Sequence, residues 1–217
     1  MKIKLTNSYF VFDLDDTIYK EVDYKISGIN HLVKKISLIY GVNLKSSSFY
    51  NRKDFIKAIQ NKLELPDDVA KSFLWEYRLH NPTISLDKNT KDTLSYIKKN
   101  SSGVAIITDG RSITQRKKIK ALGLEDIPLY ISDEYGSEKP DSKRFKIIES
   151  KDLSLNYFYV GDNITKDFIT PNKMGWTTIG LKDDGSNIHP QIISDSSKEY
   201  LPNFWINNII DLKDTFE

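Results

Sequence analysis

The stretch Tyr9-Phe10-Val11-Phe12-Asp13-Leu14-Asp15-Asp16-Thr17, near the N-terminus, joins an apolar run to a group of acids. Its first four residues form a continuous run of aromatic and β-branched side chains, which is typical of a strand buried on both faces. The run ends abruptly in acid, so we expect Asp13 and Asp15 at the carboxyl end of that strand. Acidic turns are common where chains leave sheets, so the meaning of these carboxylates depends on the rest of the chain.

Similar apolar runs recur further along the chain, and helical periodicity fills the segments between them. The predicted strands cover residues 104–107, residue 127 with 129–131, residues 157–160, the weaker run 176–179 and a final run at 204–206. The predicted helices between them cover residues 91–99, 112–122, 142–149 and 164–174. Strands that alternate with helices predict βαβ units, and therefore an α/β protein with a parallel sheet.

One segment breaks this alternation. It has helical periodicity over residues 29–39, 55–63 and 69–79 and no convincing strand. We therefore expect residues 21–82 to form an inserted helical lobe, with residues 1–20 and 83–217 as the core. Towards the C-terminus we expect loops over residues 183–187 and 194–198 around the final strand, and a short closing helix from Asn208.

Composition narrows the classes of partner. The 217 residues include 32 basic and 30 acidic side chains, so the formal charge of +2 favours neither nucleic acid nor an anionic membrane as a partner. The absence of cysteine excludes a disulfide scaffold, a thiolate metal site and a cysteine nucleophile. With no signal-peptide pattern at residues 1–8 and no long apolar span, we expect a soluble cytoplasmic protein that acts on a small molecule.

Three further polar elements belong with the opening stretch. Thr108-Asp109-Gly110 ends one predicted strand, Lys139-Pro140-Asp141 precedes a helix, and Gly161-Asp162-Asn163, with Asp167, follows a later strand. In an open parallel sheet, loops beyond the carboxyl ends of the strands converge on one crevice. Carboxylates, a hydroxyl group and a lysine gathered there suit phosphoryl transfer with a divalent metal ion.

These four elements, in this order, resemble those of the haloacid dehalogenase (HAD) superfamily over nearly the whole chain. The resemblance implies a Rossmann-like, doubly wound core. It also implies that the inserted lobe is the small helical cap that one branch of the superfamily carries just after its first motif.

The resemblance also implies a role for each matching residue. Asp13 would attack phosphorus and become an aspartyl-phosphate, and Asp15 would act first as general acid and then as general base. Mg²⁺ would be held by the Asp13 carboxylate, the main-chain carbonyl of Asp15 and Asp162, with Asp167 in or just behind the first coordination shell. Thr108 and the N–H groups of Asp109 and Gly110 would hold phosphoryl oxygens, and Lys139 would neutralise charge.

Other residues near these motifs are candidates for substrate contact or for structural roles. Asp109 departs from the superfamily pattern, in which asparagine is commoner, and Arg111 could pair with Asp109 or reach an anionic group of the substrate. Tyr19, Lys20 and Asp23, where a cap hinge would face the substrate, are further candidates for substrate selection. Asp16 is expected to cap a turn and Thr17 to bond backbone. His31, His80 and His189 have no metal-ligand spacing.

The sequence therefore predicts a Mg²⁺-dependent phosphatase that hydrolyses a small phosphate monoester, such as a sugar phosphate or a nucleotide. Three alternatives stay open. A phosphosugar mutase would use the same residues and return the phosphoryl group to its substrate. Dehalogenase activity fits the lysine and the acidic metal set less well, and a binding protein with a vestigial site would be expected to lack a key residue.

Overall fold

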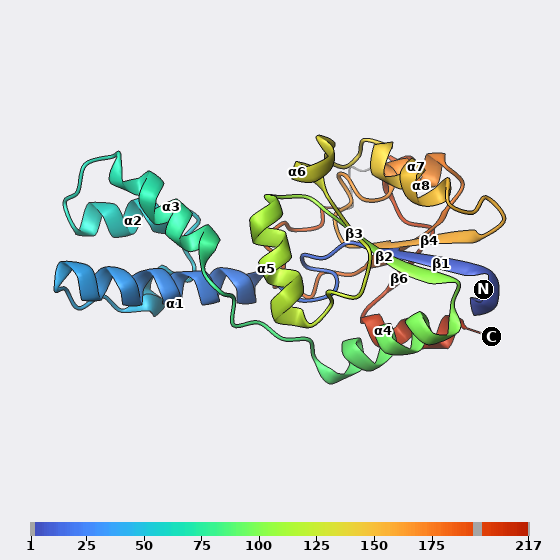
Figure 1. Cartoon of the computed structure of the whole chain (residues 1–217), viewed down its shortest axis with the longest axis horizontal. Coiled ribbons are helices and arrows are strands. Elements are labelled where there is room, and N and C mark those ends of the chain that lie inside the picture. The colour runs from blue at the N-terminus through green and yellow to red at the C-terminus, as the bar shows by residue number, and fades with distance from the viewer. Residues whose placement is uncertain (1–2, 193–196, 217) are drawn as a thin grey trace.

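The structure is a computed structural model that describes residues 3–192 and 197–216 (Figure 1). Six strands form one parallel sheet in the order β3-β2-β1-β4-β5-β6. The strands are β1 (Ser8–Phe12), β2 (Gly103–Thr108), β3 (Leu129–Ile131), β4 (Asn156–Gly161), β5 (Thr177–Leu181) and β6 (Phe204–Ile206). All the predicted strands are present, and the α/β fold with its parallel sheet is confirmed.

The strand order places a crevice at the centre of the sheet. The chain runs outward from β1 through β2 to β3, and then crosses back to add β4 on the other side of β1. Ligands of doubly wound sheets bind where the direction of strand addition reverses, beyond the carboxyl ends of the strands. Here that position lies between the ends of β1 and β4, and it is occupied by the loops that begin at Asp13 and Asp162.

Helices cover both faces of the sheet (Figure 1). Alternate residues of β1 separate the two layers, because Phe10 and Phe12 belong to one buried cluster and Val11 to the other. The first cluster includes side chains of α4 and α5, and the second includes side chains of α7. The helices of the core are α4 (Lys88–Asn100), α5 (Ser112–Leu122), α6 (Ser132–Tyr135), α7 (Lys143–Glu149) and α8 (Ile169–Lys173).

The inserted segment forms a helical lobe that projects from the core beside α5 (Figure 1). Its helices are α1 (Glu21–Tyr40), α2 (Phe55–Lys62) and α3 (Val69–Leu79). They enclose a buried cluster of their own, to which α1 contributes Ile29, Leu32, Val33 and Ile36. The assignment of residues 21–82 as a separate domain remains a prediction, and this cluster supports it.

Two predicted helices were wrong in extent. The helix expected over residues 164–174 is confined to Ile169–Lys173, because side chains bond the preceding backbone. Asp167 accepts a hydrogen bond from the N–H of Asn163, and Asn163 accepts one from the N–H of Thr165. The other helix, α1, is longer than predicted, because it begins at Glu21 rather than at residue 29. At this end Asp16 accepts a hydrogen bond from the Glu21 N–H at 2.8 Å.

The C-terminal segment closes the core. A 3₁₀ helix, Ile209–Thr215, begins after Asn208 as predicted, although it is not an α-helix. The loop predicted over residues 194–198 falls largely outside the described residues.

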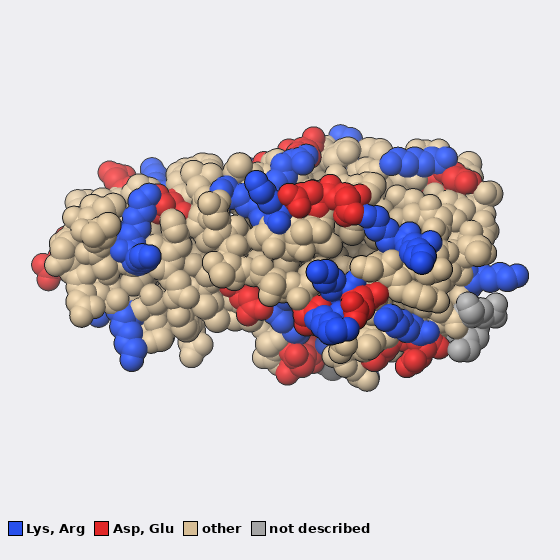
Figure 2. All heavy atoms as spheres, turned by 60° about the horizontal axis from the view of Figure 1, so that its bottom comes forward, with Lys and Arg blue, Asp and Glu red and all other residues tan. Residues whose placement is uncertain are grey.

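The surface is mixed in charge. Figure 2 shows basic and acidic side chains interspersed over one face, which agrees with the near-zero net charge. Within residues 3–192 and 197–216, no helix combines the length and the apolar character that crossing a bilayer requires.

Candidate active site

The carboxyl ends of three central strands bring the predicted motifs together. Asp13 follows β1, Thr108 ends β2 and Asp162 follows β4. Together with Asp15 and Asp109, these side chains line a small cavity of about 160 Å³. The parallel register explains this convergence, since β1 pairs with both β2 and β4. Segments that are nearly 150 residues apart in sequence therefore share one crevice.

Lys139 is completely buried beneath this cavity. Its Nζ donates to Asp13 Oδ1 at 2.6 Å, to Asp167 Oδ1 at 2.6 Å and to the Tyr159 hydroxyl at 3.2 Å. Burial by itself favours the neutral amine, but the attraction of Asp13 and Asp167 outweighs it and raises the pKa of Lys139 well above its usual value. The lysine is therefore a fixed positive charge that bridges two acids.

Three buried carboxylates, those of Asp13, Asp162 and Asp167, have oxygen atoms within 4.8 Å of one another. Burial raises the pKa of Asp13 to about 7, although Lys139 opposes the shift. Burial and the neighbouring charges of Asp167 and Asp13 raise the pKa of Asp162 to about 9. Lys139 and Lys166 together do not cancel the raised pKa values of Asp13 and Asp162, so a bound cation would stabilise the ionised cluster.

Asp162 is held on both sides by polar side chains. Thr17 donates to its Oδ1 at 3.2 Å, and Asn187 donates to its Oδ2 at 2.9 Å. Thr17 therefore bonds a carboxylate of the acidic cluster, and the prediction that it bonds backbone was wrong. Asn187 comes from the loop after β5, whose Ile188 N–H also bonds Asp16, so this loop connects the first and last motifs.

Asp15 accepts hydrogen bonds from three donors. Tyr19 donates through its hydroxyl at 2.5 Å, Lys118 through Nζ at 2.7 Å and Gln115 through Nε2 at 2.9 Å. Burial by itself raises the pKa of Asp15, but Lys118, Tyr19 and Gln115 together outweigh burial and lower it. Asp15 is therefore ionised at neutral pH in this conformation.

Thr108 is fixed by the same glutamine. Gln115 Nε2 lies 2.5 Å from the Thr108 hydroxyl and 3.0 Å from the main-chain oxygen of Asp109. Gly110 has a φ of 137°, a conformation that a side chain would strain. Its N–H, which was expected to face a phosphoryl oxygen, donates instead to the Ser132 hydroxyl at 2.9 Å.

Asp109 is neutralised from beneath by Arg144, which is completely buried. Arg144 donates to the Asp109 carboxylate at 2.6 Å and to the main-chain oxygen of Thr108 at 2.9 Å. Burial opposes ionisation of Asp109, but Lys139, Lys166 and Arg144 keep its pKa below the usual value. The suggested pairing of Arg111 with Asp109 was wrong, because Arg111 pairs with Asp133 at 3.1 Å.

Replacing Asp109 with asparagine should lower the free energy of unfolding by about 2 kcal/mol, because it removes a charged hydrogen bond and leaves Arg144 buried without its carboxylate. Denaturant unfolding would measure the loss. The matched control is Asp133→Asn, which disrupts the more exposed pair with Arg111 and should cost less than about 1 kcal/mol. Equal losses in the two variants would contradict the role given to Arg144.

The candidates for substrate selection are not gathered at this site. Tyr19 is buried and bonds Asp15. Lys20 bonds Asp184 and Asn187, and neither Lys20 nor Asp23 lines the cavity that contains Asp13. Of the four candidates, Arg111 alone lines a larger neighbouring cavity that also reaches Asp15.

Sequence reasoning missed three residues that position the motifs, namely Gln115, Lys118 and Arg144. A signal was present in the helices. On α5, Gln115 and Lys118 occur at helical spacing from the buried Ile119 and Leu122, and on α7, Arg144 precedes the buried Phe145 and Ile148. Polar side chains on the apolar face of a helix need buried partners, so they could have been flagged as part of a polar network.

The fold and the site together define an α/β protein with a buried acid–lysine centre at the carboxyl edge of its sheet. A profile of the haloacid dehalogenase-like hydrolase family matches residues 10–181. The chain belongs to this family.

Similar proteins agree with this assignment. The glyceraldehyde 3-phosphate phosphatase of Methanocaldococcus jannaschii is 27% identical over 190 residues, which cover 79% of this chain and 83% of that protein. Family membership and this relative together place the chain among the phosphoric monoester hydrolases of the family.

Two solved structures share the fold over nearly the whole chain. The 2-haloacid dehalogenase of Pseudomonas syringae has a TM-score of 0.62 at 16% identity, with 96% of this chain and 97% of that chain covered. A HAD phosphatase of Thermococcus onnurineus has a TM-score of 0.58 at 19% identity, with 95% and 96% covered.

Proposed function

We propose that the protein is a Mg²⁺-dependent phosphatase that hydrolyses a small phosphate monoester through an aspartyl-phosphate on Asp13. The observation that carries this proposal is the position of Asp13. Its carboxylate lines the small cavity and is bonded by the buried Lys139, and Asp15 lines the same cavity. A nucleophile and an acid–base group therefore face one space that can hold a phosphoryl group.

Lys139 supports Asp13 as the nucleophile. A protonated carboxyl group does not attack phosphorus, and burial works against ionisation of Asp13. The ammonium group at 2.6 Å stabilises the ionised form. In the first step an Asp13 oxygen bonds to phosphorus as the bond from phosphorus to the alcohol oxygen breaks. In the second step water displaces Asp13 and releases inorganic phosphate.

Asp15 serves in both steps of the proposed reaction. It protonates the departing alcohol oxygen and then accepts a proton from the attacking water. Its resting pKa is low, so it must gain a proton before the first step. A phosphate group bound in the small cavity that Asp15 lines brings negative charge close to Asp15 and raises its pKa. A phosphate monoanion also carries a proton of its own.

The acidic cluster fits a hard divalent cation. Asp13 and Asp162 present carboxylate oxygens, which Mg²⁺ prefers, and the excess negative charge around Lys139 favours a cation. Asp13 and Asp162 line the small cavity, whereas Asp167 is completely buried and does not line it. We therefore assign Asp167 to a supporting position behind Asp13 and Asp162. When bound, Mg²⁺ supplies positive charge that neutralises phosphoryl oxygens.

The substrate class rests on the relative and on the cavities. The Methanocaldococcus jannaschii relative is named for glyceraldehyde 3-phosphate, which supports a small phosphorylated metabolite as the substrate here.

A phosphosugar mutase would use the same residues and yield an isomerised phosphosugar without free phosphate. A cytoplasmic location remains a prediction.

The direct test is release of phosphate from p-nitrophenyl phosphate and from a panel of sugar phosphates and nucleotides. We expect turnover with Mg²⁺ and none after treatment with EDTA. No release from any ester would overturn the proposal, and isomerisation without release would favour the mutase.

Mg²⁺ should also stabilise the folded protein, because it binds a carboxylate cluster that exists only in the folded chain. At 100 times its dissociation constant the expected gain is about 2.7 kcal/mol, or a rise of roughly 5–10 °C in the melting temperature. Thermal unfolding with Mg²⁺ and with EDTA measures it. The variant Asp162→Asn should lose most of this rise, whereas Asp133→Asn should keep it. An unchanged melting temperature in the wild type would argue against the metal site.

A further inference from the structure

We propose that the alcohol part of the substrate carries a second anionic group, and that Arg78 on α3 of the helical lobe binds this group. The inference rests on the proposed phosphatase function and deepens it by naming the class of leaving group. The chemistry that Arg78 recognises is a carboxylate or a second phosphate.

The place for the leaving group is a second cavity of about 770 Å³. It is lined by the start of α1, the end of α3 and one side of α5, so the lobe and the core both contribute walls. Asp15, Glu21 and Asp109 line both this cavity and the small one that holds Asp13. A phosphate ester whose phosphorus faces Asp13 would therefore extend past Asp15 into the larger cavity.

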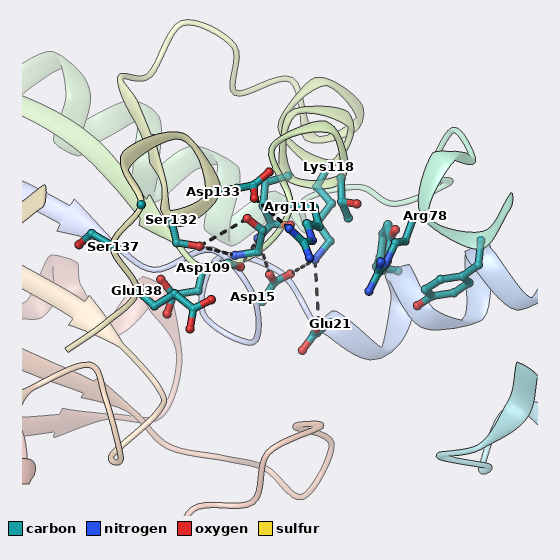
Figure 3. Close-up of a pocket in the computed structure, with 16 residues that line it drawn as sticks. Asp15, Glu21, Arg78, Asp109, Arg111, Lys118, Ser132, Asp133, Ser137 and Glu138 are labelled. Carbon is teal, nitrogen blue, oxygen red and sulfur yellow. Dashed lines mark hydrogen bonds and ion pairs between the residues drawn. The ribbon is translucent and has the colours of Figure 1, made fainter. Parts of the chain in front are cut away.

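Figure 3 shows how charge is arranged along this cavity. Arg78 lies at the end that the helical lobe forms, and Ser137 and Glu138 lie at the other end. Two of the three cations that line the cavity have acidic partners. Lys118 contacts Asp15 at 2.7 Å, and Arg111 contacts Asp133 at 3.1 Å.

Arg78 differs from these cations. Its side chain is half-buried, and its guanidinium carbon lies 5.7 Å from the centre of the Trp75 ring. No carboxylate pairs with it in the part of the chain that the structure describes. A half-buried guanidinium group has lost part of its hydration, and its planar set of donors matches the oxygens of a carboxylate or a phosphate.

Two hydroxyl groups in the same cavity also lack partners. Tyr24 is buried and Thr114 is half-buried, and both line the cavity. The Thr114 hydroxyl lies close to the Tyr24 hydroxyl. Within the described residues, however, neither oxygen makes a hydrogen bond that meets the usual distance and angle criteria. Buried polar groups in folded proteins nearly always have partners. Both hydroxyl oxygens are closed off from solvent, so Arg78 is the donor on which binding of an anion in this cavity rests.

The experiment compares phosphate esters that differ only at the far end of the alcohol. Phosphoglycolate ends in a carboxylate, ethanediol bisphosphate in a phosphate and hydroxyethyl phosphate in a neutral hydroxyl, and their four-carbon homologues test reach. We expect the wild type to prefer at least one anionic ester over its neutral counterpart by about 10- to 100-fold in kcat/KM. The carboxylate and bisphosphate arms identify which anion is bound.

Arg78→Met should abolish that preference. It should lower kcat/KM for the preferred anionic ester at least about 10-fold and leave the neutral ester within about twofold, because a single charged contact is removed. Arg78→Lys should restore part of the preference. The matched control is Arg52→Met, which removes an exposed arginine of the same lobe and should leave both values unchanged. A wild type without preference, or a preference that Arg78→Met retains, would overturn the inference.

Failure of the phosphatase proposal is a separate outcome. If no ester, p-nitrophenyl phosphate included, is hydrolysed, calorimetric titration of the same esters still tests Arg78. Tighter binding of an anionic ester by the wild type than by Arg78→Met would support the site, and equal binding would overturn it.

Discussion

The variant Asp13→Asn is expected to lower kcat for phosphate release at least about 1,000-fold, because an amide oxygen at this position is a poor nucleophile and cannot form the acyl-phosphate that water later hydrolyses. The Asp13 carboxylate is buried next to the phosphoryl cavity, and a neutral amide of the same shape fits the same space. The measurement is steady-state release of phosphate from the best ester of the panel.

Stability separates this effect from misfolding. Asp13→Asn keeps Lys139 paired with Asp167, so the free energy of unfolding in EDTA should change by less than about 1.5 kcal/mol. The control Asp92→Asn removes an exposed carboxylate that lines neither cavity and should retain full activity. A folded Asp13→Asn protein with kcat within tenfold of the wild type would refute Asp13 as the nucleophile.

The variant Lys139→Met should lose both activity and stability. Removing the ammonium group leaves Asp13 and Asp167 buried without their shared cation, and breaking a buried ion pair in this way costs about 3–5 kcal/mol. The expected fall in kcat is at least about 100-fold, because Asp13 becomes protonated more readily and loses nucleophilicity. Chemical denaturation in EDTA and phosphate release measure the two losses.

The loss of stability should grow with pH. Without Lys139 the pKa of Asp13 rises further, and a raised carboxyl pKa makes the free energy of unfolding fall as pH rises from the unfolded-state pKa towards the folded-state pKa. The difference from the wild type should therefore be larger at pH 8 than at pH 5.5. Lys143→Met, on an exposed lysine of α7, should cost less than about 0.5 kcal/mol.

A double variant covers the case in which Lys139→Met does not fold. Asp167→Asn in the Lys139→Met background removes one uncompensated charge, so it should recover part of the stability without recovering activity. If the single variant is as stable as the wild type, Lys139 is not the buried counter-charge described here.

Much of the core could be predicted because its signals are local. A buried parallel strand is a continuous apolar run, and Asp13, Thr108 and Asp162 stand at the ends of such runs, so topology alone brings them together. The strand order completes that argument, since β1 lies between β2 and β4.

The rest depends on tertiary contacts that no local pattern encodes. Lys118 and Arg144 resemble surface residues of charged helices in sequence, and their burial follows from helices docking against loops. Lys20 shows the reverse case, because Asp184 holds a side chain that sequence position had placed near the substrate. The segment before α8, which periodicity predicts to be helical, takes another path because side chains of Asp167 and Asn163 accept hydrogen bonds from its backbone.

The three hydrogen bonds that Asp15 accepts affect the two steps of the proposed reaction differently. An ionised Asp15 is ready to accept a proton from water, but it must acquire one before it can assist a departing alcohol. The first half-reaction therefore has a requirement that the second half-reaction lacks. Alcohols that are more acidic need less protonation as they depart, so catalytic speed should follow the acidity of the leaving group.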